Sequence, residues 1–322
     1  ALARWFGAVH VFDIARAPRG REKLANPGPE DAAPKTPARL LPCPHMTWFY
    51  EHYKGASAVG VHTEKLLHES KSAFQSIKVF ETTGHGRLLT LDDMVMLTEL
   101  DEFVYHELLS HLALCAHPNP TSVLVVGGGD GGCVREVLKH PSVERVVQCE
   151  IDEAVTRVCQ EFIPSVARGL EDPRCELVFA DAVQYVRDNP NTFDVILVDS
   201  TEPIGPAEAL FGAEFFRDIH TALRPGGIVT AQAESPFYAP DVVRGLFDAV
   251  RPIFQHVHPY MGFIPTYPSG AWTFLFASDE ATPESIDKNR VDALDARYVT
   301  SELANGAFAV PAFARALALP TT

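Results

Sequence analysis

The sequence predicts an α/β protein in which a mostly parallel sheet carries helices on both faces and follows a small antiparallel β domain. Two observations support this prediction. From residue 123 to residue 231, short apolar runs alternate with segments of helical period, which is the rhythm of βαβ units. From residue 47 to residue 100, short runs alternate polar with apolar residues between turn signals, which is typical of antiparallel hairpins.

The first 45 residues predict an extension outside this fold. They contain seven of the 25 prolines and nine alanines, and they sustain neither the period of a strand nor that of a helix. We expect residues 1–45 to be disordered or foreign to the native chain, and the functional protein to begin at Met46.

Residues 46–100 are predicted to form the β domain, and residues 101–322 the larger domain. The β runs are VGVHTEKLLHE, FQSIKVFETTGHGRLLTLDD, whose alternation breaks at Gly84 and Gly86, and MVML. At Thr98 the period changes, because TELD offers a capping threonine with an acid three residues later. DEFVYHELLSHLALCA then has apolar residues at helical spacing and predicts a helix over 101–116.

Past residue 120, apolar runs predict strands at 123–126, 145–149, 176–179, 194–198 and 228–231, with helices near 133–140, 152–168, 182–187 and 213–223. Runs this apolar are typical of parallel strands buried on both faces. The runs 254–263 and 271–278, separated by IPTYPSG, predict a hairpin that closes the sheet with an antiparallel edge.

The bulk composition narrows the class of protein. The chain has 322 residues, no run of 18 apolar residues and no charged leader before an apolar block, which predicts a cytoplasmic protein. Its net charge of −15 argues against a nucleic-acid surface and is compatible with cationic ligands. The six cysteines form no C-x-x-C pair, and His106 and His111 are five residues apart, so we expect free thiols and no metal site.

The stretch VLVVGGGDGGCVREVL, residues 123–138, runs an apolar strand through a glycine turn into a helix. Gly127, Gly129 and Gly132 match the G-x-G-x-x-G spacing of dinucleotide sites. Asp130, however, puts a negative charge where a pyrophosphate would lie.

Acidic side chains follow each of the five predicted strands, and none of these positions holds a lysine or arginine. They are Asp130, Glu150, Asp181, Asp199 with Glu202, and Glu234 after Gln232. Because the ligand of an open parallel sheet lies beyond the carboxyl ends of its strands, these side chains should line one site. Each close carboxylate–phosphate pair would cost roughly 4 kcal/mol at an effective dielectric of about 20, so NAD is disfavoured. Asp194, which begins its strand, is predicted to be structural.

The acids nevertheless suit a nucleoside. Glu150 stands 20 residues after Asp130, at the tip of the second strand, where a carboxylate can accept both ribose hydroxyls. A ligand that is nucleoside-like and cationic, such as an S-adenosyl sulfonium, meets both conditions. Intact S-adenosylmethionine also carries a carboxylate, which Asp130 would repel, whereas the decarboxylated form ends in an ammonium that Asp130 could bind.

From about Met46 to the C-terminus the chain resembles the spermidine synthase family of polyamine aminopropyltransferases. The motifs that carry the resemblance are FQSIKVF, LTELDEFVYHE, GGGDGG, CEID, FADA, DSTEPIGPAEALF, TAQAESPF and IPTYPSGAW. The resemblance implies a Rossmann-like, methyltransferase-type catalytic domain. It also implies a transferase that moves an aminopropyl group from decarboxylated S-adenosylmethionine, a co-substrate, to a diamine, usually putrescine. The products would be spermidine and methylthioadenosine, and the protein a homodimer or homotetramer with no cofactor.

The resemblance further implies a role for each site residue. Asp199 would orient and deprotonate the attacking amine, assisted by hydrogen bonds from Tyr105 and Tyr267. The donor would contact Gln75, His106, Gly127, Gly129, Asp130, Gly131, Glu150, Asp181 and Ala182, with Glu150 on the ribose and Asp181 on the adenine. The acceptor would contact Glu202, Gln232, Glu234 and Trp272, beneath a gate formed by residues 203–211.

Several positions depart from the family pattern. Met96 stands where glutamine is common, Glu202 where aspartate is common, Asp93 replaces a glycine, and His85 replaces an aromatic residue. Because Met96 and Glu202 would face the acceptor, cadaverine, agmatine or a longer polyamine stays open as the substrate. An S-adenosylmethionine-dependent methyltransferase shares the fold and the Glu150 argument. A noncatalytic polyamine-binding module would explain the acids, and a dehydrogenase only the glycines.

Overall fold

The structure, a computed structural model, describes residues 47–53, 55 and 57–319; the predicted extension and Met46 lie outside them. The first sheet is an antiparallel meander of β1 (Thr47–Tyr53), β2 (Ser57–Lys71), β3 (Ser76–Thr82), β4 (Arg87–Leu91) and β5 (Met94–Thr98). Gly86, with φ of 69°, lies in the turn between β3 and β4, where the alternation was predicted to break. Asp92 and Asp93 both have positive φ, as the two central residues of a tight hairpin turn require.

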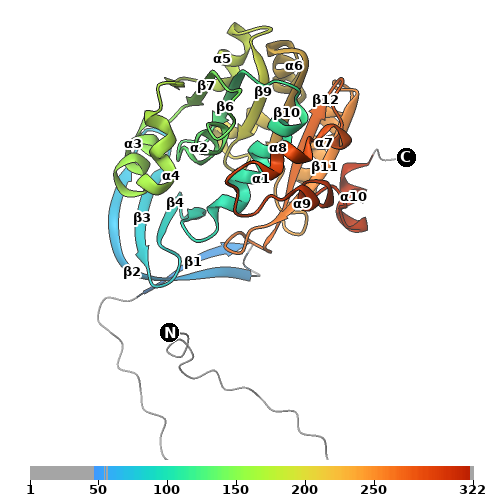
Figure 1. Ribbon diagram of the computed structural model, residues 1–322. Helices are drawn as coiled ribbons and strands as arrows, with labels where there is room; N and C mark the ends of the chain where they lie inside the picture. The colour runs from blue at the N-terminus through green and yellow to red at the C-terminus, as the bar shows by residue number, and fades with distance from the viewer. Residues whose placement is uncertain (1–46, 54, 56, 320–322) are drawn as a thin grey trace, which may run out of the picture. The chain divides into compact units, whose positions relative to one another are not determined.

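Helix α1 (Glu102–Ala116) lies at the centre of the fold, as Figure 1 shows. One apolar cluster joins its buried side chains to those of β3–β5 on one side and of β6 and β9 on the other. The prediction that Thr98 caps this helix is wrong. Its hydroxyl instead donates to the Asp101 carboxylate at 2.6 Å, and Asp101 holds the N-cap position.

The second sheet has seven strands in the order β11-β12-β10-β9-β6-β7-β8. Its parallel strands are β6 (Ser122–Gly127), β7 (Arg145–Glu150), β8 (Cys175–Phe179), β9 (Phe193–Asp199) and β10 (Leu223–Gln232). The chain proceeds outward from β6 to β8 and then returns to the other side of β6, so the strand order reverses between β6 and β9. Such a switch point opens a crevice beyond the strand ends.

The predicted hairpin forms the antiparallel edge of this sheet, with β12 (Ala271–Ser278) against β10 and β11 (His256–Phe263) outermost. Asp194 has the structural role predicted for it. Its Oδ2 accepts the backbone N–H groups of Thr121 and Ser122 at 2.8 and 2.9 Å, which holds the starts of β6 and β9 together.

Helices cover both faces of the second sheet, which confirms the predicted fold class (Figure 1). The α1 face also carries α2 (Gly132–Val137), α3 (Glu153–Phe162), α4 (Pro164–Ala167), η1 (Arg168–Glu171), η3 (Pro283–Ser285), α8 (Lys288–Asp292) and α9 (Ser301–Gly306). The other face carries α5 (Ala182–Asp188), η2 (Gly205–Phe211), α6 (Ala213–Ala222), α7 (Pro240–Val250) and α10 (Ala312–Ala318).

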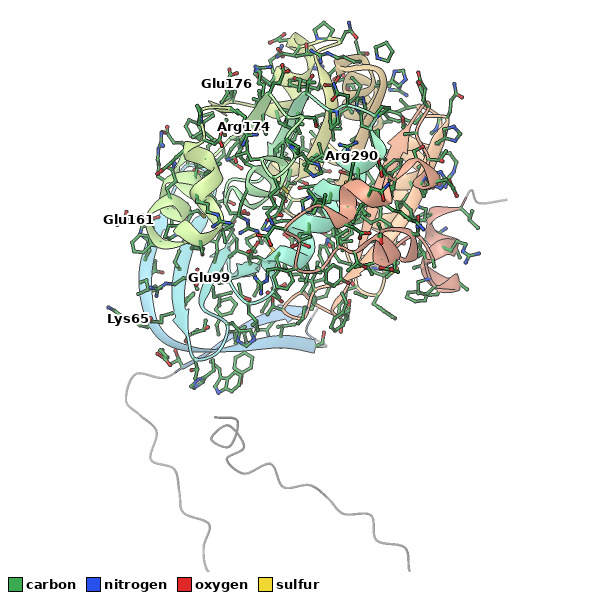
Figure 2. All side chains as sticks on the ribbon, viewed as in Figure 1. Lys65, Glu99, Glu161, Arg174, Glu176 and Arg290 are labelled. Carbon is green, nitrogen blue, oxygen red and sulfur yellow. The ribbon has the colours of Figure 1, made fainter. Side chains whose placement is uncertain are left out.

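A polar contact also links the end of the first sheet to helix α4. Glu99, labelled in Figure 2 just beyond β5, accepts hydrogen bonds from the Ser165 hydroxyl of α4 and from the Arg87 backbone N–H at 2.8 Å.

Among the described helices, none combines the length and the apolar character that crossing a membrane requires.

Candidate active site

A cavity of about 210 Å³ lies beyond the carboxyl ends of β6, β7, β8 and β9, where the switch point predicts it. Twelve of the predicted site residues line it: Gln75, Tyr105, His106, Gly127, Gly129, Asp130, Glu150, Asp181, Ala182, Asp199, Glu202 and Tyr267. Among the residues that the structure describes, the other four predicted site residues lie outside this lining: Gly131, Gln232, Glu234 and Trp272.

The glycine turn allows the tips of β6 and β9 to approach closely. Gly127 pairs with Asp199 across the sheet, and the Gly128 N–H donates to the Asp199 carbonyl at 2.8 Å. Both glycines have left-handed φ values of 76° and 63°. A Cβ on Gly127 would overlap the Asp199 carbonyl oxygen, and one on Gly128 would lie 2.8 Å from Asp199 Oδ2. These positions therefore require glycine for the approach as well as for the backbone angle.

Asp130 is held as an ionised carboxylate. Its Oδ1 accepts the Gly132 N–H at 2.7 Å and faces His106 Nε2 at 3.3 Å. Burial opposes the charge, but His106 and the Gly132 N–H hold the pKa of Asp130 below its ordinary value. The other ring nitrogen, His106 Nδ1, lies 2.6 Å from Glu102 Oε2. His106 therefore bridges two carboxylates rather than standing free beside the cavity.

Asp199 has the opposite electrostatic setting. Its Oδ1 accepts the Tyr105 hydroxyl at 2.8 Å, while Oδ2 is buried and finds no hydrogen-bond partner among the described residues. Burial and the neighbouring Asp130 charge raise the pKa of Asp199 to about 6. The two acids at the switch point thus differ, since one is fixed in its ionised form and the other is a weak base.

Tyr267 does not form the predicted hydrogen bond to Asp199. Its hydroxyl donates to the Met96 carbonyl at 2.7 Å instead, and its ring lies 5.9 Å from that of Tyr105 and 4.7 Å from that of Trp272. Asp101 positions this segment by accepting both the backbone N–H and the hydroxyl of Thr266, at 2.8 and 2.7 Å. Tyr267 therefore closes the cavity wall between the first sheet and the hairpin.

Polar side chains gather in the part of the cavity where the sequence predicts the nucleoside of the donor. Glu150 Oε1 accepts the Asp152 N–H at 2.8 Å, and burial raises the pKa of Glu150 to about 7. Gln75 donates its side-chain amide to Asp152 at 3.0 Å, and Asp152 caps α3 through Ala154. Asp181 caps α5 by accepting the Val183 N–H at 2.9 Å. Asp152 was missed at the sequence level, because its own position predicts only a helix cap.

Comparison with known proteins identifies the family. The model of the spermine/spermidine synthase domain matches residues 102–288, and that of the spermidine synthase tetramerisation domain matches residues 47–99. The chain belongs to the spermidine synthase family. The resemblance in its motifs is confirmed, and aminopropyl transfer is the activity class of this transferase family.

Individual relatives agree over most of the chain. The polyamine aminopropyltransferase of Thermoanaerobacter sp. (strain X514) is 43% identical over 268 residues, which cover 83% of this chain and 97% of that protein. A spermidine synthase crystallised with the transition state analogue AdoDATO superposes with a TM-score of 0.84 at 37% identity, covering 87% of this chain and 97% of that one. The spermidine synthase of Thermotoga maritima gives 0.81 at 36% identity, covering 87% and 96%.

This spermidine synthase family member has a second group of acids beside the cavity, which sequence reasoning found only in part. Glu51 on β1 accepts the Val95 N–H at 2.9 Å, and burial followed by the Glu202 charge raises its pKa to about 7. Burial and the Glu202 charge also raise the pKa of Glu234 to about 8, and burial raises that of Glu202. Both carboxylate oxygens of Glu234 and Glu202 Oε2 are buried without partners among the described residues.

Tyr53 lies close enough to these acids to feel their charges, and the sequence did not reveal it as a site residue. Its pKa is raised to about 12 by burial and then by the charges of Glu234, Glu202 and Glu51. Glu234 has a φ of 73°, a strained backbone angle for a residue with a side chain, which is common at ligand-binding positions. The term acidic group is used below for Glu51, Glu202 and Glu234.

Two predicted acceptor residues have other contacts in this family member. Gln232 donates its amide to the Ser200 and Thr201 carbonyls at 3.2 and 3.3 Å, and its Oε1 accepts the Glu234 N–H at 3.0 Å. It therefore holds the loop after β9 against the loop after β10. Trp272 is buried with its indole Nε1 unpartnered in the described part of the chain.

One set of side chains could in principle bind a metal ion. His106, Cys133 and Asp199 offer ligand atoms that all lie within 4.8 Å of one another. Both nitrogens of His106 already face carboxylates, however, at 2.6 and 3.3 Å. A metal would have to displace Asp130 or Glu102 from the ring, so the arrangement favours an ion-paired histidine.

Proposed function

We propose that this family member transfers the aminopropyl group of decarboxylated S-adenosylmethionine to putrescine, giving spermidine and methylthioadenosine. The observation that carries the proposal is the pairing, in one cavity, of an ionised Asp130 with a weakly basic Asp199. A fixed carboxylate is suited to hold an ammonium, and an unpartnered one is suited to accept a proton. The names of the relatives reported above specify no acceptor, so the choice of a diamine rests on the acidic group, and that of putrescine on the family resemblance.

The nucleoside of the donor would lie along the tips of β6, β7 and β8. Glu150 would accept the ribose hydroxyls, and a carboxyl whose pKa is about 7 retains this ability in either protonation state. Asp181 and Ala182 would face the adenine, and Gln75 the aminopropyl chain. The donor's ammonium would then lie against the Asp130 carboxylate. The negative charge of Asp130 would also attract the donor's positively charged sulfonium.

The reaction would be an in-line displacement. The amine nitrogen forms a bond to the aminopropyl carbon next to sulfur, the carbon–sulfur bond breaks, and its electron pair remains on sulfur, which becomes a neutral thioether. Asp199 accepts the proton that the nitrogen loses. The pKa of Asp199, about 6, is about four units below that of an ordinary alkylammonium, a gap of about 5 kcal/mol. Asp199 would therefore receive the proton as the bond forms rather than deprotonate a solvated ammonium beforehand.

The far ammonium of the acceptor would be held by the acidic group. All three carboxyls have raised pKa values, and Glu202 and Glu234 also have buried oxygens without partners among the described residues. Such groups are unstable as anions alone, so a cation between them relieves their mutual repulsion. A neutral or anionic nucleophile gains nothing from this arrangement. We therefore favour a diamine over any monoamine.

The deciding experiment incubates the protein with decarboxylated S-adenosylmethionine and, in parallel, putrescine, cadaverine, agmatine and spermidine, and quantifies methylthioadenosine and the polyamine product. We expect the highest kcat/KM with putrescine. A higher kcat/KM with another amine would make that amine the acceptor in place of putrescine, and the proposal of aminopropyl transfer would stand. Methyl transfer from intact S-adenosylmethionine, with no methylthioadenosine from any amine, would overturn the proposal in favour of a methyltransferase.

We also propose a homo-oligomer, since the segment 47–99 matches a family model described as a tetramerisation domain. Sedimentation equilibrium distinguishes a dimer from a tetramer. The cytoplasmic location and the absence of a cofactor stay predictions, which cell fractionation and assay after exhaustive chelation test.

A further inference from the structure

A chain of buried charges runs from the cavity into the protein interior. Asp130 faces His106, His106 faces Glu102, and the Arg135 guanidinium on α2 binds Glu102 with two hydrogen bonds, Nη1 to Oε1 at 2.9 Å and Nη2 to Oε2 at 2.8 Å. Glu102 and Arg135 are 6% and 9% exposed, and within the described residues neither lines the cavity. These two residues have no part in the function proposed above.

The geometry fixes the charge of His106. Each ring nitrogen faces a carboxylate, and a carboxylate oxygen facing another acceptor would be repelled. Both nitrogens must therefore carry a proton, which makes the ring an imidazolium. Burial would by itself lower the pKa of His106, but Asp130 and Glu102 hold it well above the ordinary value.

The contacts also fix the position of His106. A Cβ on Gly132 would overlap the imidazole ring, so α2 packs directly against it. On α1, Tyr105 lies edge-on to the ring at 5.4 Å between centroids. The titratable and charged groups that face the ring from the elements around it are Glu102, Tyr105, Asp130, Cys133, Arg135 and Asp199.

We propose that Glu102 and Arg135 are positioning residues for the donor. The fork of Arg135 fixes Glu102, Glu102 fixes His106 as an imidazolium, and the imidazolium holds the Asp130 carboxylate toward the donor's ammonium. This inference rests on the proposed function only in assigning that ammonium to Asp130. It is also consistent with the difference between the two adjacent acids. At Asp130 the His106 charge outweighs burial, whereas at Asp199 burial and the Asp130 charge outweigh the stabilisation that His106 and Tyr105 provide.

The test compares substitutions of the two glutamates that accept hydrogen bonds from the Arg135 guanidinium. Glu102→Gln removes the charge that faces His106 and keeps the shape. Glu136→Gln is the matched control, since Glu136 is also buried and accepts Arg135 Nε at 2.8 Å but does not touch His106. In Glu102→Gln we expect the KM for the donor to rise about tenfold, while kcat/KM for the amine at saturating donor changes less than about twofold. In Glu136→Gln we expect both constants to stay within about twofold of wild type.

Histidine NMR in the ligand-free protein gives a readout that does not depend on activity. His106 of the wild type should keep both ring protons to a higher pH than the same ring in Glu102→Gln. If Glu102→Gln fails to fold, the double variant Glu102→Gln/Arg135→Met, which leaves no lone charge of this pair, takes its place. Equal donor KM in wild type and Glu102→Gln, with both rings titrating alike, would overturn the inference.

The two proposals fail in different ways. A wild type that transfers no aminopropyl group, but whose His106 titration depends on Glu102, would refute the proposed function and leave the fixed imidazolium intact. If the wild type is active and the two variants Glu102→Gln and Glu136→Gln change the donor KM equally, Glu102 contributes only to stability.

Discussion

Tyr105 donates its hydroxyl to Asp199 Oδ1 at 2.8 Å, and Asp199 Oδ2 stays buried without a partner among the described residues. The two oxygens of one carboxylate are therefore unequal. One is anchored to the central helix α1, which orients the group, and the other accepts no hydrogen bond from the described residues. An amine that enters the cavity would complete the missing hydrogen bond.

Replacing Asp199 by asparagine should abolish turnover while the donor still binds. The amide cannot accept a proton from the attacking nitrogen, but Asp130, Glu150 and Asp181 remain unchanged. We expect kcat to fall by at least about 10³-fold, given the loss of both the proton acceptor and the orienting charge. Calorimetric titration with the donor should give a Kd within about threefold of wild type. Turnover equal to wild type would exclude Asp199 from the mechanism.

Replacing Tyr105 by phenylalanine should shift the pH dependence rather than stop the reaction. In the wild type, kcat/KM for the amine should rise with pH through about 6 as Asp199 loses its proton. The Tyr105 hydrogen bond favours the Asp199 anion, so its loss raises the pKa and moves this limb to higher pH, by about one unit or 1.4 kcal/mol. Profiles at saturating donor measure the shift. A uniform loss of rate at every pH would instead mean that Tyr105 only shapes the cavity.

Replacing Glu234 by glutamine should stabilise the protein at high pH and weaken acceptor binding. Burial and Glu202 raise the pKa of Glu234 to about 8, from 4.5 in the unfolded chain. The folded state therefore binds more protons than the unfolded state between these values, and stability falls as pH rises through this window. Glutamine cannot ionise, so the free energy of unfolding at pH 8.5 should increase by about 1–3 kcal/mol, with a smaller difference near pH 5.

Urea denaturation at the two pH values measures the change in stability, and steady-state kinetics measures the KM for the diamine. The same substitution removes a carboxylate from the acidic group, so this KM should rise. Glu153→Gln, in an exposed ion pair with Arg157 on α3, is the control and should leave both quantities unchanged. A destabilised Glu234→Gln at pH 8.5 would contradict the burial argument.

The sequence predicted the second sheet well because its signals are local. The apolar runs and the glycine turn mark strands and one ligand-binding edge without knowledge of distant contacts. The acids that follow the first four parallel strands line the cavity as expected, since parallel strands end at the same edge of a sheet. They are Asp130, Glu150, Asp181 and Asp199 with Glu202. The start of helix α1 was predicted wrongly, since the Thr98 hydroxyl donates to the Asp101 carboxylate and Asp101 holds the N-cap position.

Contacts between distant segments account for what the sequence did not reveal. Glu51 and Tyr53 stand on β1 and reach Glu234 only because the first sheet folds against the second. Nothing in the alternation TWFYEHY distinguishes a site acid from a solvated one. The imidazolium between Glu102 and Asp130 likewise depends on how α1 packs against the glycine turn, which neither segment encodes alone.

Replacing Tyr267 by phenylalanine should have a smaller effect than replacing Tyr105, although both rings line the same cavity. The Tyr267 hydroxyl donates to the Met96 carbonyl, so its loss leaves one backbone acceptor unpaired and leaves Asp199 untouched. The cost should be about 1–2 kcal/mol of stability, with the pH at which kcat/KM rises unchanged. Thermal unfolding and the same pH profiles separate the two variants. If Tyr267→Phe moved the acid limb as far as Tyr105→Phe, the hydroxyl would have to turn from Met96 to Asp199 when substrates bind, and the originally predicted hydrogen bond would form in the complex.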